Sequence, residues 1–151
     1  MRIYKLLLPV LGLVLIGVDA KAQQKLIVAK KTKPISTPNF VVLPYYASDS
    51  DITGFEKEAK PAPLNNEELS KVEMVLIRAA QENKLKVYKR QYVCVIDQHG
   101  DKLVWVNCFC HAFNDWRNSI QMVMDGGDCF YSLIINLSTG KYTGLIVNGE
   151  A

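Results

Sequence analysis

Residues 88–110 read YKRQYVCVIDQHGDKLVWVNCFC, two apolar runs on either side of a short polar segment. Such runs, rich in β-branched and aromatic residues, are typical of β-strands. A two-residue loop at His99-Gly100 is predicted to join them, because glycine adopts a positive φ at little cost. The pattern therefore predicts an antiparallel strand pair over Tyr88–Ile96 and Lys102–Cys110.

This predicted register gives the hairpin two apolar faces. One face carries Val93, Val95, Val104, Val106, Cys108 and Cys110. The other face carries Tyr92, Cys94, Ile96, Leu103, Trp105 and Phe109. A helix covers only one face of a sheet, so the second face needs another cover, either the N-terminal part of the chain or a partner.

Residues 64–83 predict an amphipathic helix before the hairpin. Asn66 is expected to cap it, and Glu67 and Glu68 then lie in the first turn, where the helix dipole favours acidic side chains. Apolar residues recur at steps of three and four, which places them on one face. These residues are Leu69, Val72, Leu76, Ala79 and Ala80.

Three further elements are predicted after the first hairpin. Asp115–Ser119 is expected to form a short helical turn, followed by a strand from Ile120 that ends at the double glycine of residues 126–127. The spacing of Trp116, Ile120 and Val123 or Met124 also fits a helix, so a helix within 113–124 is the alternative. Residues 129–137 and 141–147 predict a second hairpin. Its register aligns Tyr131, Leu133 and Ile135 with Val147, Leu145 and Thr143 on one face, together with Cys129.

The order of these elements predicts an α+β fold. One amphipathic helix packs on a four- or five-stranded antiparallel meander sheet. We assign this α+β domain to residues 64–151. Residues 23–63 hold five of the six prolines and predict an extended arm, with any strand confined to a sheet edge and a flexible stretch at 47–60.

The first residues have the three-part layout of a signal peptide. Arg2 and Lys5 precede an apolar run at 6–18, and Ala20-Lys21-Ala22 is a typical cleavage site, so residues 1–22 are predicted to be removed. The run is shorter than the roughly 20 residues that span a bilayer. We therefore expect export to the periplasm or the cell exterior, with no membrane attachment after cleavage.

The net charge of the predicted mature chain limits the classes of function that it can have. Residues 1–22 hold three of the 18 basic and one of the 15 acidic residues, so the predicted mature chain carries a net charge of +1. This balance argues against nucleic-acid binding. No nucleophile, base and orienting group are assembled in the sequence, and His99 with its neighbouring aspartates is interpreted as a solvated turn. We predict no enzyme activity, no catalytic residue and no cofactor.

The four cysteines are the residues that most suggest chemistry. In an exported protein they indicate disulfide formation, and the predicted faces pair Cys129 with Cys110 or with Cys108. Cys94 points the other way and is interpreted as a buried free thiol.

The alternative is a metal site for zinc or reduced copper, with Cys108, Cys110, His111 and Cys129 as ligands. The spacing argues against this site, because a strand turns His111 away from Cys110 unless the strand ends there.

Aromatic residues are candidates for a binding patch. Trp105 with Phe109, and Phe113 with Trp116, form a predicted surface for a protein or peptide partner if they are exposed. Core packing, or packing under the arm, is the alternative interpretation.

A resemblance supports the same layout. The helix-then-meander order, with Met124–Phe130 and Asn148–Ala151 at its end, resembles small uncharacterised secreted bacterial proteins. Over roughly residues 64–148 the order is also similar to PepSY-like and cystatin-like domains. The cystatin Gln-x-Val-x-Gly loop is absent at Asp97–Asp101, so protease inhibition is not implied, whereas PepSY-like domains imply an accessory or inhibitory module.

These observations predict an exported, non-enzymatic binding or accessory domain whose partner is a protein or peptide. The alternative is a thiol-redox or metal-handling protein that uses Cys108, Cys110 and Cys129. The sequence specifies no oligomeric state.

Overall fold

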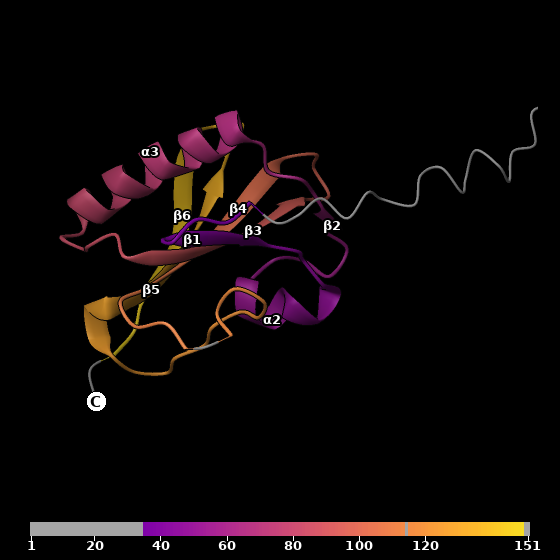
Figure 1. Ribbon diagram of the computed structural model, residues 1–151. Coiled ribbons are helices and arrows are strands. Elements are labelled where there is room, and N and C mark those ends of the chain that lie inside the picture. The colour runs from indigo at the N-terminus through magenta and orange to yellow at the C-terminus, as the bar shows by residue number, and fades with distance from the viewer. Residues whose placement is uncertain (1–34, 114, 150–151) are drawn as a thin grey trace, which may run out of the picture. The chain divides into compact units, whose positions relative to one another are not determined.

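The computed structural model describes residues 35–113 and 115–149 and has an α+β fold. Figure 1 shows the helix α3 (Asn66–Glu82) on one face of the sheet and the short helix α2 (Ser50–Thr53) on the other side. The predicted signal peptide and the first residues of the arm lie outside the described residues. Within the described part of the chain, no helix has both the length and the apolar character needed to cross a membrane.

The sheet contains strands from both sides of the predicted boundary at residue 63. In space the order is β1-β3-β4-β5-β6, and the short β2 also pairs with β3. The strands are β1 (Phe40–Leu43), β2 (Lys60–Pro61), β3 (Lys89–Ile96), β4 (Lys102–Phe109), β5 (Phe130–Asn136) and β6 (Lys141–Val147). Strands β3 to β6 form the predicted antiparallel meander.

The purely antiparallel sheet was a wrong prediction, because β1 runs parallel to β3 with Phe40 opposite Arg90. This strand belongs to the segment that we predicted to be an extended arm. It lies at the edge of the sheet and is flanked by Pro38 and Pro44, as expected for a strand next to residues that cannot donate a backbone hydrogen bond. The sheet is therefore mixed.

The first hairpin differs from the prediction by one residue of register. The N–H of Asp97 donates to the carbonyl of Asp101 at 2.9 Å, and Gly100 has a φ of +86°, so the loop has three residues instead of two. Val93 consequently pairs with Trp105. A one-residue slip moves every side chain of one strand to the other face. The helix side therefore carries Tyr92, Cys94, Val104, Val106 and Cys108, and the opposite side carries Val93, Val95, Leu103, Trp105 and Phe109.

Helix α3 begins one residue earlier than predicted, with Asn65 as its cap in place of Asn66. The Asn65 side chain accepts from the Glu68 N–H at 2.9 Å, and the Glu68 carboxylate accepts from the Asn65 N–H at 3.0 Å. This reciprocal capping box satisfies two backbone donors at the helix start. Burial raises the pKa of Glu68, but the hydrogen bond from Asn65 and the ammonium group of Lys102 outweigh it, and the net pKa is lowered.

The predicted apolar face of α3 is confirmed. Leu69, Val72, Leu76, Ala79 and Ala80 are all buried, and Val75 joins them. Leu69, Val72, Val75, Leu76 and Ala79 pack with the helix side of the sheet. Tyr92 and Arg90 of β3 reach Glu73 of the helix, where the Tyr92 hydroxyl donates to Oε1 at 2.6 Å and Arg90 Nη2 lies 2.7 Å from the same oxygen.

The second face of the sheet is covered by the chain itself. Residues 45–59 contain the 3₁₀ turn η1 (Ala47–Asp49) and α2, and the buried side chains of Tyr45, Phe55 and Ala59 pack against this face. The stretch at 47–60, for which the sequence predicts flexibility, contains helical turns in which Ser50 and Thr53 are buried. This burial removes apolar surface from water and supplies the cover that the sequence required.

The second hairpin follows the predicted register at one end. Tyr131 pairs with Val147 as expected, whereas Ile135 pairs with Tyr142. A bulge around Gly144, which has a φ of +60°, adds one residue to β6 and shifts the pairing.

The segment before this hairpin is irregular. Backbone bonds from Asn118 and Ser119 to the Asp115 carbonyl confirm the predicted turn at 115–119. The strand predicted from Ile120 was wrong, since residues 120–126 form no strand and the 3₁₀ turn η2 (Gly127–Cys129) leads into β5.

Candidate functional site

A cavity of about 330 Å³ opens on the sheet face opposite α3, beside β5 and β6. Its walls come from three parts of the chain: the sheet, α2, and the irregular loop at 121–124. Among the described residues that line it, none is charged. The lining includes Asn107, Met122, Met124, Ser132 and Ile146.

The rim of the cavity is unusually apolar for a solvent-facing surface. Met122 is 52% exposed, Met124 is 88% exposed and Ile146 is 63% exposed. Methionine side chains are flexible and polarizable, and they are common at surfaces that adapt to several ligands. The sequence pattern had placed both methionines on a strand, so this surface was missed. The available signal was a pair of apolar residues directly before an irregular Asp-Gly-Gly segment.

A buried network of amide side chains holds the loop over the sheet. Gln91 of β3 is fully buried, and its Nε2 donates to the carbonyls of Trp116 and Ser119. Its Oε1 accepts from Asn107 Nδ2 at 3.1 Å and from the Gln121 N–H at 2.9 Å. Sequence reasoning missed this network, although a glutamine within an apolar strand was a signal for it. Buried polar side chains of this kind are retained when they are fully hydrogen-bonded.

Two further side chains, Gln121 and Asn148, attach the two ends of the loop. Gln121 Nε2 donates to the carbonyl of His111 at 2.7 Å, and Gln121 Oε1 accepts from the Phe113 N–H at 3.0 Å. Asn148, just after β6, donates to the carbonyls of Val123 and Asp125. The loop is thus attached at its start to β3 and at its end to the end of β6.

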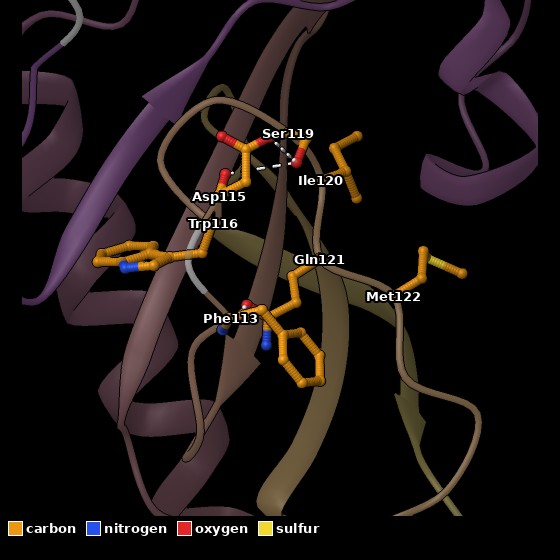
Figure 2. Close-up of a pocket in the computed structure, with 7 residues that line it drawn as sticks. All are labelled: Phe113, Asp115, Trp116, Ser119, Ile120, Gln121 and Met122. Atoms are coloured by element: carbon orange, nitrogen blue, oxygen red, sulfur yellow. Dashed lines mark hydrogen bonds between the residues drawn. The ribbon is translucent and has the colours of Figure 1, made fainter.

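A smaller cavity of about 140 Å³ lies beside the turn at 115–119 and is lined by residues between 113 and 122. Figure 2 shows its lining residues, with Trp116 and Met122 pointing in opposite directions. Asp115 is the acidic residue in this lining, and bonds from the side chains of Asn118 and Ser119 lower its pKa. Because these bonds serve the turn itself, Asp115 is a structural residue of the loop.

The predicted aromatic patch is corrected by the structure. Trp105, Phe109 and Trp116 are buried, and the rings of Phe109 and Trp116 meet edge to face at 5.6 Å. Only the fourth candidate, Phe113, is exposed. The alternative interpretation of core and arm-covered packing holds for the three buried rings, because residues 45–59 and the loop cover their face of the sheet.

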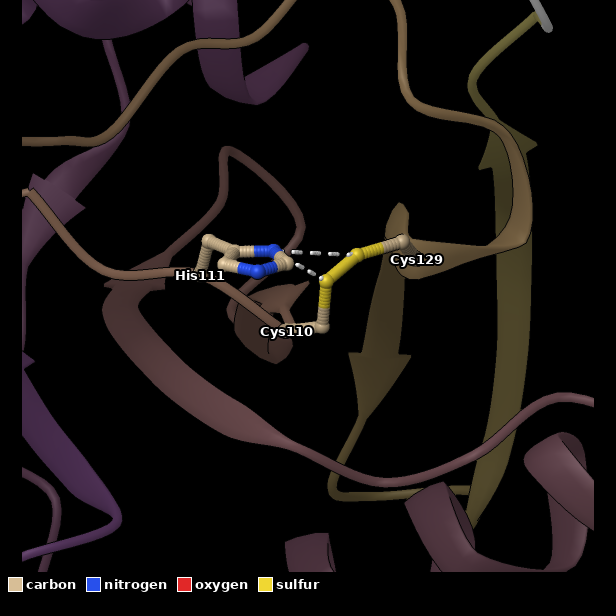
Figure 3. A group of neighbouring side chains, drawn as sticks. All are labelled: Cys110, His111 and Cys129. Atoms are coloured by element: carbon tan, nitrogen blue, oxygen red, sulfur yellow. Dashed lines mark hydrogen bonds between the residues drawn. A yellow bond between two sulfur atoms is a disulfide. The ribbon is translucent and has the colours of Figure 1, made fainter.

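Cys110 and Cys129 form a disulfide between the end of β4 and the start of β5. This is one of the two pairings that the sequence left open. Figure 3 shows the imidazole of His111 beside the two sulfur atoms. Its Nδ1 lies 2.8 Å from Cys110 Sγ and 3.9 Å from Cys129 Sγ. The strand β4 ends at Phe109, which is the condition under which His111 can turn toward its neighbour.

Cys108 does not belong to this group. It is fully buried on the helix side of the sheet, whereas Cys110 lies beyond the strand, so the four-ligand set with Cys108 is corrected to three residues. Burial raises the pKa of the Cys94 and Cys108 thiols to about 12, which leaves both protonated near neutral pH. Both are free thiols, as predicted for Cys94.

His99 lies in the hairpin turn, exposed to solvent. The Asp97 carboxylate accepts from the N–H groups of His99 and Asp101 at 2.9 and 2.8 Å. This arrangement agrees with the predicted turn role of the three residues.

Comparison of the chain with protein-family models, curated proteins and solved structures gives no match.

Proposed function

We propose that this protein is an exported binding module that holds an extended, apolar peptide segment at the cavity beside β6. The observation that carries the proposal is an uncharged cavity of about 330 Å³ whose rim exposes Met122, Met124 and Ile146. Ligand pockets typically have volumes of roughly 300–1,000 Å³ and mostly apolar linings with a few polar groups. The predicted signal peptide supports export.

The uncharged lining of the cavity determines which kind of side chain can bind in it. An uncharged cavity disfavours a charged side chain, because a buried charge without a partner is costly to desolvate. Asn107 and Ser132 are the polar groups of the sheet side, and the Asn107 amide nitrogen is already bonded to Gln91 and Gln121. An aliphatic or aromatic side chain is therefore the best occupant.

The edge of the sheet supports an extended peptide backbone. β6 is the last strand of the spatial order, and within the described residues only β5 pairs with it. An extended peptide can add to such an edge through main-chain hydrogen bonds, with alternate side chains reaching neighbouring pockets.

The test uses a host peptide of alternating threonine and serine with one guest position, titrated by calorimetry and by NMR. Leucine and phenylalanine guests are expected to bind and to shift the resonances of Met122 and Ile146, whereas an aspartate guest should not bind. The double variant Met122→Gln, Met124→Gln should bind at least about ten-fold more weakly, because burial of even one methionine side chain contributes about 1.5 kcal/mol or more.

Met74→Gln is the matched control, since Met74 is 64% exposed on α3, away from the cavity. Equal affinity of the double variant and the control, or binding of the aspartate guest as tight as that of leucine, contradicts the proposal.

A second candidate is thiol–disulfide exchange at Cys110 and Cys129, favoured by the position of His111 Nδ1 at 2.8 Å from Cys110 Sγ. Cys108, which we first grouped with this activity, is fully buried. Structural disulfides in secreted proteins have reduction potentials below about −300 mV. A potential above this value, measured by equilibration with dithiol buffers, supports exchange, and a lower one contradicts it.

A further inference from the structure

We propose that reduction of the Cys110–Cys129 disulfide creates a binding site for copper(I), with the two cysteine thiolates and the imidazole of His111 as ligands. The ligand atoms of these three residues lie within 4.8 Å of one another. These three residues do not line the peptide cavity, and the inference does not depend on peptide binding.

The backbone keeps the two sulfur atoms close after the bond is broken. The β4–β5 ladder runs up to the pair Phe109 and Phe130, and Cys110 and Cys129 are the next opposed residues. The Cys110 N–H donates to the Cys129 carbonyl at 3.1 Å, and their Cα atoms are 5.3 Å apart. The strand pairing therefore presents both thiols to one ion without help from the disulfide.

His111 is held in place by a residue of the loop network. Its carbonyl accepts from Gln121 Nε2 at 2.7 Å, and Gln121 is itself almost fully buried. This bond fixes the backbone on which the imidazole stands, while the ring itself is exposed. An ion can reach the group from solvent, so the site needs no opening of the fold.

The donor set favours copper(I). Thiolate ligands select soft ions, structural zinc sites use four protein ligands, and a zinc site with three protein ligands adds water as its fourth ligand. The structure assembles three donors here, and Cys94 and Cys108 are buried on the helix side of the sheet, away from solvent. The reductant that opens the disulfide also keeps copper in its monovalent state.

The reaction balances in two steps. A dithiol reductant transfers two electrons and two protons to the disulfide, which gives two cysteine thiols and the cyclic disulfide of the reductant. Copper(I) then displaces the two thiol protons, and the neutral imidazole donates its lone pair. The complex of two thiolates and one monovalent ion carries one negative charge, which solvent screens at this exposed position.

The experiment titrates copper(I) into the whole protein in competition with a chromophoric copper(I) chelator, under anaerobic conditions. The protein is used oxidised, reduced with a dithiol and desalted, or reduced and alkylated. Only the reduced, unblocked protein is expected to take up one ion per chain, with thiolate-to-copper absorption in the near ultraviolet. Zinc added in excess should not displace it.

Variants separate this site from adventitious binding. His111→Ala keeps both cysteines and should lower the copper(I) affinity at least roughly ten-fold. His99→Ala is the matched control, because His99 is the other of the chain's two histidines and lies exposed in a turn. The copper(I) affinity of the His99→Ala variant should equal that of the protein without substitutions.

Four results would overturn the inference. The first three are uptake by the alkylated protein, equal affinities for His111→Ala and His99→Ala, and displacement of copper(I) by zinc. A reduced protein that keeps its cooperative thermal transition but takes up no copper(I) would also refute it. Failure of peptide binding would leave this result unaffected, so the two proposals are tested separately.

Discussion

Replacing Gln91 with methionine tests whether the buried amide network holds the loop that forms the cavity wall. Methionine has a similar length and no hydrogen-bonding amide. The change leaves the carbonyls of Trp116 and Ser119 and the N–H of Gln121 without their partner, whereas Asn107 keeps its bond to the Gln121 carbonyl.

The expected cost follows from these three backbone groups. Each buried group that loses its hydrogen bond costs about 1–3 kcal/mol, and two of the three bonds are buried, so the free energy of unfolding should fall by about 2 kcal/mol or more. Domains of this size are typically stable by about 5–15 kcal/mol, so the change is readily measured. The apolar methionine offsets part of the loss, and movement of the loop toward water offsets another part.

Urea denaturation measures the global change, and hydrogen exchange of the Gln121 amide measures the local one. Gln98→Met is the matched control, because the Gln98 side chain is exposed and bonds only to Glu56 among the described residues. It should leave stability within about 0.5 kcal/mol. If Gln91→Met costs less than about 1 kcal/mol and the Gln121 amide stays protected, the loop is held by something other than this network.

Two further predictions concern the contacts of α3. Because the pKa of Glu68 lies below its ordinary value of 4.5, the stability that it contributes is present above pH 4.5 and is lost as the pH falls through the lowered pKa. Glu68→Gln should therefore flatten the decline of unfolding free energy between about pH 5 and pH 3, measured by urea titration, and an unchanged slope would assign the decline to other carboxylates. Tyr92→Phe removes the bond from the Tyr92 hydroxyl to Glu73 and should cost about 1.5–3 kcal/mol in thermal or urea unfolding, because the acceptor is charged. Tyr46→Phe, at an exposed position, is its control, and equal stability of the two variants would show that the bond contributes nothing.

Local sequence patterns were sufficient to predict helix α3 and the strands β3 to β6. The three- and four-residue spacing of α3 and the alternation of β3 and β4 depend on backbone geometry, which each segment carries in its own sequence. The pairing of Cys110 or Cys108 with Cys129 was predicted from the faces that the expected registers gave to the strands, although the register of the first hairpin differs by one residue. The structure selected Cys110, because Cys108 lies within β4 and faces the helix.

Register was harder to predict, because it depends on loop length. A three-residue turn at Gly100 and a bulge at Gly144 each move the pairing by one residue, and each change is small in sequence but exchanges whole faces. Residues 120–126 were wrongly predicted for a different reason, because the alternation of Ile120, Met122 and Met124 resembles that of a strand. Their backbone is instead attached to Gln91 and Asn148.

The sequence by itself determined the α+β class, the helix and its buried face, the strands of the meander, and a short list of cysteine pairings. Only the tertiary structure decided that residues 45–59 cover the aromatic face, that β1 pairs parallel with β3, and that His111 stands beside the disulfide. The physical reason is the range of the interactions. Periodic burial is set by neighbours within a turn or a strand, whereas the cavity and the Cys-His group depend on side chains that meet only after distant segments have packed.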